Sequence, residues 1–171
     1  TDFWAMVFNP SSVERILHVW IGAIIAGAFL VMSVHGYYLL KGRFTEMSKK
    51  AFKIALPVAA LFSVLQLVTG HSSAEVAAEH QPAKLAAFEG HYGNDGPSDL
   101  YLFGWVDQAR ERVYGPKIPG GLSFMIHGDF NTPVPALRDF PEENIPAQVN
   151  AVFQFYHLMV AVGLYFIGLT I

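Results

Sequence analysis

The sequence predicts an all-α membrane protein, in which transmembrane helices form part of a larger bundle and one long loop lies on the extracytoplasmic side. Hydrophobic residues make up 53% of the 171-residue chain and charged residues only 15%. This composition is too apolar for an ordinary soluble domain. The apolar residues are gathered into three runs, which one short basic stretch and one long mixed segment separate. Runs of this kind are typical of membrane-spanning helices.

Composition also limits the kinds of site and partner. The net charge of −3 argues against nucleic acid as a partner. The chain contains no cysteine, which leaves His, Met and carboxylates as metal or haem ligands. It begins at Thr1 without a Met and stops at Ile171 within an apolar run, so we expect a fragment of a larger polypeptide that is truncated at both ends.

The first predicted transmembrane helix covers residues 13–40, after a short lead-in segment at residues 1–12. No Asp, Glu, Lys or Arg occurs between Ile16 and Leu40. At 1.5 Å per residue, this run exceeds the roughly 30 Å of bilayer hydrocarbon. It contains two histidines, His18 and His35.

A short basic loop is predicted at residues 41–53, followed by a second span at residues 54–70. The loop carries one acid, Glu46, against five basic residues: Lys41, Arg43, Lys49, Lys50 and Lys53. Short basic loops between spans lie on the cytoplasmic side. The first helix therefore runs from outside to inside and the second returns, with Pro57 tolerated as it is in other membrane helices.

Residues 71–148 form a long loop that we expect on the extracytoplasmic side, and residues 149–171 form the third span. The loop has turn signals such as Gly115-Pro116 and Pro119-Gly120-Gly121. Its many aromatic residues favour an ordered structure. A loop of this length that is ordered is usually functional.

The decapeptide Gln81–Gly90 contains two charges, Lys84 and Glu89, among small and apolar residues. We expect a short helix. The two charges are five residues apart, or about 140° around the helix axis, so they do not form a salt bridge on one face. The residues alone fit either a solvated loop helix or a helix that grips a ligand.

Two spans carry candidate haem ligands beside glycines. His18 has Gly22 one turn further on, and Met159 has Gly163 in the same relation. The small residues fit close helix packing, and they fit equally a flat macrocycle held by His18. Met159 fits either a core-filling role or that of an axial thioether. Together, His and Met ligation would make a six-coordinate, electron-transferring haem.

The remaining histidines are weaker candidates. His35 is 17 residues from His18, about 25 Å along the axis, so the two cannot share one iron. His157 lies two residues before Met159 and faces another side of the helix. The loop histidines match no zinc pattern and are expected to be surface or pocket residues; they are His71, His80, His91 and His127.

Several segments together resemble the middle portion of subunit I of the cytochrome bd-type quinol oxidases. They occur in the family's order, cover nearly all of the chain, and are Asn9-Pro10, His18, Tyr38–Arg43, Lys84–Glu89, Leu102-Phe103-Gly104, Asp107, Thr132-Pro133-Val134 and Met159–Gly163. The resemblance implies that His18 and Met159 are the axial ligands of a low-spin haem b. It also implies that the loop binds quinol through Lys84 and Glu89.

The resemblance implies a respiratory enzyme of the prokaryotic cytoplasmic (inner) membrane. Its partners would be quinol, the lipid bilayer, the remainder of subunit I and subunit II. A second haem b and haem d, where O2 is reduced to water, would have ligands outside this chain, and the fragment alone would be inactive. One departure concerns His157, which stands where relatives have Arg and bears on how the charge of the haem is balanced.

In the mechanism that this implies, Glu89 accepts a proton from quinol as the electron leaves, and Lys84 holds a quinol oxygen or steadies the carboxylate. Two alternatives remain. One is a bis-His membrane b-type cytochrome, which needs paired histidines at matching depths. The other is a non-redox membrane protein, such as a transporter or assembly component, in which His18 and Met159 are packing residues.

Overall fold

The computed structural model describes residues 2–93 and 96–171 and divides into two compact units. We call residues 1–73 with 161–171 the helical unit, and residues 74–160 the loop unit. Two helices, α3 (Thr45–His80) and α6 (Val149–Thr170), contribute residues to both units. The chain is helical for most of its length, as predicted.

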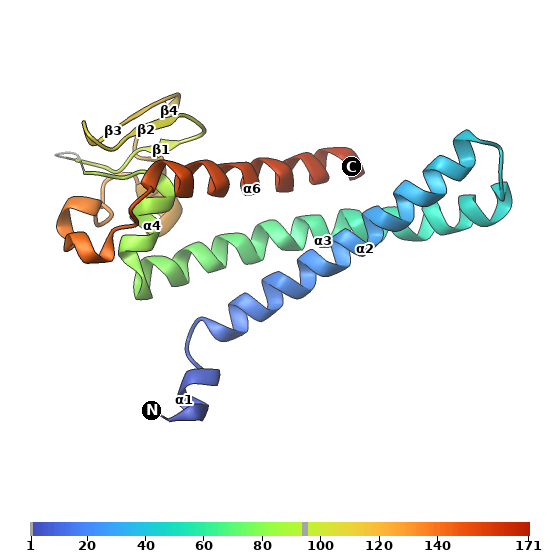
Figure 1. Ribbon diagram of the computed structural model, residues 1–171, viewed down its shortest axis with the longest axis horizontal. Helices are drawn as coiled ribbons and strands as arrows, with labels where there is room; N and C mark the ends of the chain where they lie inside the picture. Colours follow the sequence, from blue (N-terminus) through green and yellow to red (C-terminus); the bar gives the residue numbers. More distant parts are fainter. Residues whose placement is uncertain (1, 94–95) are drawn as a thin grey trace. The chain divides into compact units, whose positions relative to one another are not determined.

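The helical unit begins with α1 (Phe3–Val7) and α2 (Ser12–Leu40) and continues into α3. A short turn at residues 41–44 joins α2 to α3 (Figure 1). These two helices pack through small and flexible buried side chains, which are Ala28, Met32, Ala55 and Ala59. Near the end of α6, the Phe166 ring lies 4.4 Å from that of Phe29. The small alanine side chains between α2 and α3 allow the backbones of these two helices to approach closely.

The second helix is longer at both ends than the predicted span at residues 54–70. It begins at Thr45, so most of the basic stretch predicted as a loop at residues 41–53 is helical, and it continues to His80. Lys is frequent in the first flanking segment and Ala in the second, and both are strong helix formers. Charged residues mark where a span leaves the hydrocarbon core of the bilayer, but they do not end the helix. Helices α2 and α6 lie close to the bounds expected at residues 13–40 and 149–171.

Three segments of the described chain are long and apolar enough to cross a membrane, and they are Ser12–Leu40, Thr45–His80 and Glu142–Thr170. Large apolar side chains such as Leu30, Leu61 and Leu164 are exposed along them. Exposed apolar side chains of this kind suit contact with lipid or with further helices. The predicted class of helical membrane protein is thus confirmed.

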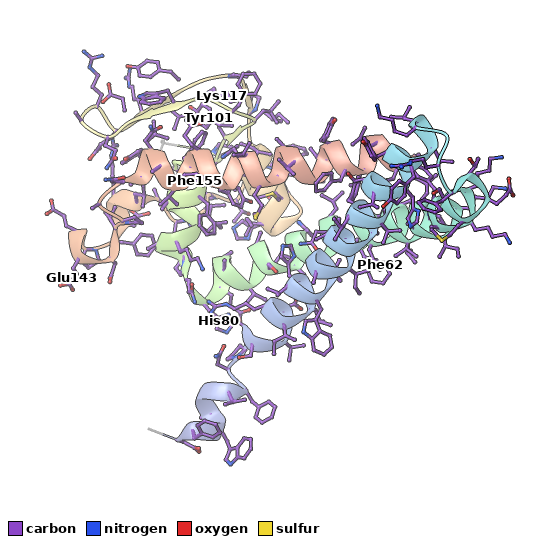
Figure 2. All side chains as sticks on the ribbon, turned by 45° about the vertical axis from the view of Figure 1, so that its right-hand side comes forward. Phe62, His80, Tyr101, Lys117, Glu143 and Phe155 are labelled. Carbon is purple, nitrogen blue, oxygen red and sulfur yellow. The ribbon has the colours of Figure 1, made fainter. Side chains whose placement is uncertain are left out.

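The loop unit is ordered by short elements, of which the sequence indicated only the helix within Gln81–Gly90. The strands β1 (Leu100–Tyr101) and β4 (Lys117–Ile118) pair antiparallel, and so do β2 (Trp105–Asp107) and β3 (Arg112–Tyr114). Tyr101 and Lys117, both labelled in Figure 2, are register partners. The unit also contains α4 (Pro82–Glu89), α5 (Gly121–His127) and two 3-10 turns, η1 (Leu137–Asp139) and η2 (Glu142–Asn144).

Helix α4 lies at the centre of the loop unit. Its Leu85 is fully buried with Leu122 and Val134. Its Ala86 and Ala87 belong to a second buried cluster, together with Tyr92, Val106, Leu137, Val149 and Phe153. The decapeptide is therefore not a solvated loop helix: half of α4 forms core, and this burial fixes where its charged residues point.

Candidate functional site

Glu89 is the last residue of α4, and its side chain is turned into the core with only 1% of the residue exposed. The helix ends there because Gly90 adopts a left-handed conformation, with φ at +60°. Burial raises the pKa of the Glu89 carboxyl to about 7, and a hydrogen bond with Tyr156 opposes part of this rise. A carboxyl with a pKa near neutral can exchange a proton at physiological pH.

Two residues about two turns into α6 face this carboxyl. The Tyr156 hydroxyl hydrogen-bonds it. The His157 Nε2 atom lies 4.0 Å from Glu89 Oε2. Oε2 itself has no hydrogen-bond partner among the described residues. A buried, unpartnered carboxylate oxygen is costly, and it is also an acceptor that a ligand can use.

His157 contacts two backbone carbonyl groups. Its Nδ1 lies 2.9 Å from the Phe153 oxygen, and its Nε2 lies 2.8 Å from the Tyr101 oxygen. Carbonyl oxygens only accept, so both contacts are hydrogen bonds at once only when both ring nitrogens carry hydrogen. His157 thereby ties α6 to strand β1 and keeps its ring beside Glu89.

Lys84, the other predicted residue of α4, is exposed and forms no ion pair with Glu89 in the described part of the chain. Its Nζ lies 5.5 Å from the centre of the Phe88 ring. Phe88 stacks on Tyr156 with ring centres 4.9 Å apart and planes 5° apart. Phe88 and Tyr156 therefore connect the exposed cation to the buried carboxyl, and sequence reasoning missed both.

In the helical unit, His18 of α2 is held by two residues of α3. Its Nδ1 lies 3.0 Å from Thr69 Oγ1, and its Nε2 lies 2.7 Å from Gln66 Nε2. Gln66 also lies against Gly22, where an added Cβ would meet its amide nitrogen at 3.8 Å. The Gln66 amide thus occupies the side of α2, beside Gly22, on which the sequence predicts a haem macrocycle.

Met159 belongs to the loop unit and His18 to the helical unit, so their pairing on one iron stays a prediction. Met159 is 54% exposed. A Cβ added at Gly163 would meet nothing within 4 Å among the described residues. His35, the other histidine of α2, has its Nδ1 3.2 Å from Ser48 Oγ.

His91 differs from the surface or pocket role expected for the loop histidines. It is buried, and its Nε2 lies 3.1 Å from both the Val134 carbonyl oxygen and Ser98 Oγ. Ser98 Oγ in turn accepts a hydrogen bond from the Val134 amide. Burial lowers the His91 pKa. This network pins the segment after α4 to residues 134–137 and has a structural role.

Comparison with known proteins places this chain in one family. The family model described as cytochrome bd terminal oxidase subunit I matches residues 1–171. A Bacillus subtilis protein provisionally named cytochrome bd menaquinol oxidase subunit I is 35% identical over 95% of this chain. The cytochrome bd-II ubiquinol oxidase subunit 1 of Escherichia coli is 32% identical over 85% of it.

A solved structure, the bd oxidase from Geobacillus thermodenitrificans, superposes on 96% of this chain with a TM-score of 0.84 and 30% identity. The chain spans only part of these proteins: 38% of the length of the Bacillus subtilis relative, 29% of the Escherichia coli relative and 38% of the Geobacillus chain. The family resemblance seen in the sequence is confirmed along the whole chain.

Proposed function

Because this chain belongs to the cytochrome bd terminal oxidase subunit I family, we propose that it is part of a respiratory oxidase that oxidises quinol and reduces O2 to water. The chain supplies the quinol-binding loop and the helices of a low-spin haem b. A second haem b and haem d take their ligands from residues outside it. The remainder of subunit I and subunit II are the partners in the membrane.

The observation that carries this proposal is the buried Glu89 carboxyl. Quinol oxidation releases two protons, so the site needs a base that is partly ionised near neutral pH. Glu89 meets this need, because its pKa is raised to about 7 and its Oε2 has no hydrogen-bond partner in the described part of the chain. A quinol hydroxyl that reaches Oε2 would satisfy this oxygen and deliver its proton to it.

Lys84 and Phe88 are the residues of α4 that we propose for holding the quinol. The exposed ammonium group of Lys84 can donate a hydrogen bond to an oxygen of the quinol. It can donate equally to the carbonyl oxygen of the quinone product, which only accepts. The Phe88 ring, stacked on Tyr156, offers a flat apolar surface of the kind on which aromatic rings pack. These roles place the substrate between an exposed cation and the buried base.

The residues of α2 fit a haem ligand on chemical grounds. Thr69 Oγ1 donates its hydrogen to the backbone carbonyl of Gln66 at 3.3 Å. The Thr69 hydroxyl can therefore only accept from His18 Nδ1. His18 then carries its hydrogen on Nδ1, and Nε2 keeps the lone pair that a metal ligand needs. We propose that His18 and Met159 would hold the haem, that Gly22 and Gly163 would lie beside it, and that His157 would help to balance its charge. A haem held in this way, when bound, supplies one-electron transfer.

We propose that the loop faces the extracytoplasmic side of the cytoplasmic membrane. The support is the charge distribution, because the basic residues between the first two spans favour the cytoplasmic side. Protons that leave quinol through Glu89 are then released outside, which makes the oxidation vectorial. The names of the relatives include both ubiquinol and menaquinol oxidases, so quinol is proposed as a class.

The test is Glu89→Gln in the full oxidase complex. The amide is isosteric but cannot take up a proton, so we expect quinol oxidation to fall by about 10²- to 10⁴-fold. Haem content and optical spectrum should remain normal. The matched control is Glu79→Gln, since the Glu79 side chain is 79% exposed at the end of α3. Normal turnover in the Glu89 variant would overturn the proposed role.

A further inference from the structure

Two polar side chains of α3, Thr69 and Gln66, contact His18 of α2, and their neighbour Ser73 bonds within α3. Ser73 Oγ donates to the backbone carbonyl of Thr69 at 2.7 Å, and Thr69 Oγ1 donates to the backbone carbonyl of Gln66. The Thr69 hydroxyl then accepts from His18 Nδ1, and the Gln66 amide donates to His18 Nε2. All four residues lie within the helical unit.

We propose that Thr69 and Gln66 are positioning residues that control how His18 takes a haem. Thr69 fixes the ring so that Nε2 carries the lone pair, and the Gln66 amide donates to that lone pair, which a haem held by His18 would need. The inference rests on the proposed function, since it requires His18 to be a haem ligand. It adds two residues for which the family resemblance gave no role.

The tautomer follows from counting hydrogens. A threonine hydroxyl has one hydrogen, and Thr69 donates it to the backbone carbonyl of Gln66. The contact between Thr69 Oγ1 and His18 Nδ1 is then a hydrogen bond only if Nδ1 donates. Partners of this kind on the second ring nitrogen orient ligating histidines and raise their basicity.

Gln66 bonds the same atom that a metal would bond. Its amide nitrogen lies 2.7 Å from His18 Nε2, and it also lies against Gly22, one turn along α2. Its Oε1 is buried and has no hydrogen-bond partner among the described residues. An amide held by one end only is a weak competitor, because its second polar atom is left unsatisfied. A haem held by His18 would have to take the place of this amide at Nε2.

The experiment measures haem binding by the full oxidase complex, prepared from haem-deficient cells and titrated with haemin. Gln66→Leu removes the competing donor with little change in volume, so haem should bind about two- to tenfold more tightly. Thr69→Val removes the hydroxyl from a side chain of the same shape, so haem should bind about 10- to 100-fold more weakly. Thr69→Ser keeps the hydroxyl and should restore binding.

The matched control is Ser63→Ala. Ser63 is a buried hydroxyl on the same helix whose Oγ has no hydrogen-bond partner in the described chain. Removing it should leave haem affinity unchanged. A second readout, which does not need the haem-free complex, is the rate at which assembled complexes lose haem to an apomyoglobin scavenger. Thr69→Val should release haem faster, and Thr69→Ser at the rate of the unaltered complex.

Two outcomes separate this inference from the proposed function. If His18→Ala loses the low-spin haem while Thr69→Val and Gln66→Leu bind and release it as the unaltered complex does, the positioning roles are wrong and the ligand stands. If His18→Ala keeps the low-spin haem, the ligand role is wrong and the inference fails with it. Weaker haem binding in Gln66→Leu would also overturn the proposed competition.

Discussion

Glu89 and His18 are both polar groups set in apolar surroundings, yet the structure treats them in opposite ways. Glu89, in the loop unit, has a carboxylate oxygen without a hydrogen-bond partner among the described residues. His18, in the helical unit, has a partner on each ring nitrogen. A proton acceptor must be open to its substrate, whereas a metal ligand must be held in one orientation. The difference fits the two roles that we propose, proton exchange at Glu89 and haem ligation at His18.

The largest effect that this contrast predicts is for His18→Ala in the full complex. The variant has no ring nitrogen at this position, so the low-spin haem b signal should disappear from the reduced-minus-oxidised spectrum, and quinol oxidation should stop. Glu89→Gln should leave the same signal intact. Loss of the haem signal in both variants would show that the two sites are one structural unit and would break the contrast.

The second prediction concerns pH. Burial raises the Glu89 pKa from 4.5 to about 7, so the carboxyl is protonated and cannot accept a proton below that pH. Quinol oxidation should therefore fall by about tenfold per pH unit as the pH drops below 7. Steady-state rates between pH 5 and 9 check this, and the step should be absent from Glu89→Gln. An acid limb centred near the ordinary carboxyl pKa would contradict the burial argument.

Tyr156→Phe sharpens the comparison, because it removes a hydroxyl and keeps the ring stacked on Phe88. The Tyr156 hydrogen bond lowers the Glu89 pKa, so its removal should raise that pKa further. The acid limb of the rate profile should move to higher pH by about one unit. The haem spectrum serves as the control. A profile identical to that of the unaltered complex would show that the hydroxyl does not act on Glu89.

The smallest expected effect is that of Lys84→Gln. The Lys84 side chain is exposed and lies over the Phe88 ring. An exposed charge contributes little to binding, so the KM for quinol should rise by about two- to fivefold while kcat changes less. Steady-state kinetics with a soluble quinol analogue measure both constants. A large fall in kcat would instead place Lys84 in the proton-transfer step.

The sequence was informative where hydrophobicity alone decides the structure. The long apolar runs predicted α2 and α6 closely, because only a helix satisfies its own backbone in a membrane. The same reasoning missed both ends of α3, since good helix formers such as Lys and Ala continue a helix beyond the bilayer. The short strands were also missed, being two or three residues long.

Site residues were predictable to the extent that they carry unusual side chains. His18 and Glu89 stood out as ionisable groups in apolar stretches, but the burial of Glu89 depends on contacts that sequence order does not reveal. Gln66 and Thr69 did leave a signal. They follow Ser63 and precede Ser73 at spacings of three and four residues, which places a polar stripe on one face of an apolar helix. A search for such stripes beside an intramembrane histidine would have found them.

The glycine that ends α4 has a consequence for variation in this protein. Gly90 has φ at +60°, and a Cβ there would approach Val113 at 2.8 Å and Val106 at 3.1 Å. Any other side chain would strain the turn and push against these two valines, next to the buried Glu89. A natural variant at this position could retain every residue with catalytic chemistry and every haem and still be inactive. Genetic surveys that score only reactive side chains would pass over it.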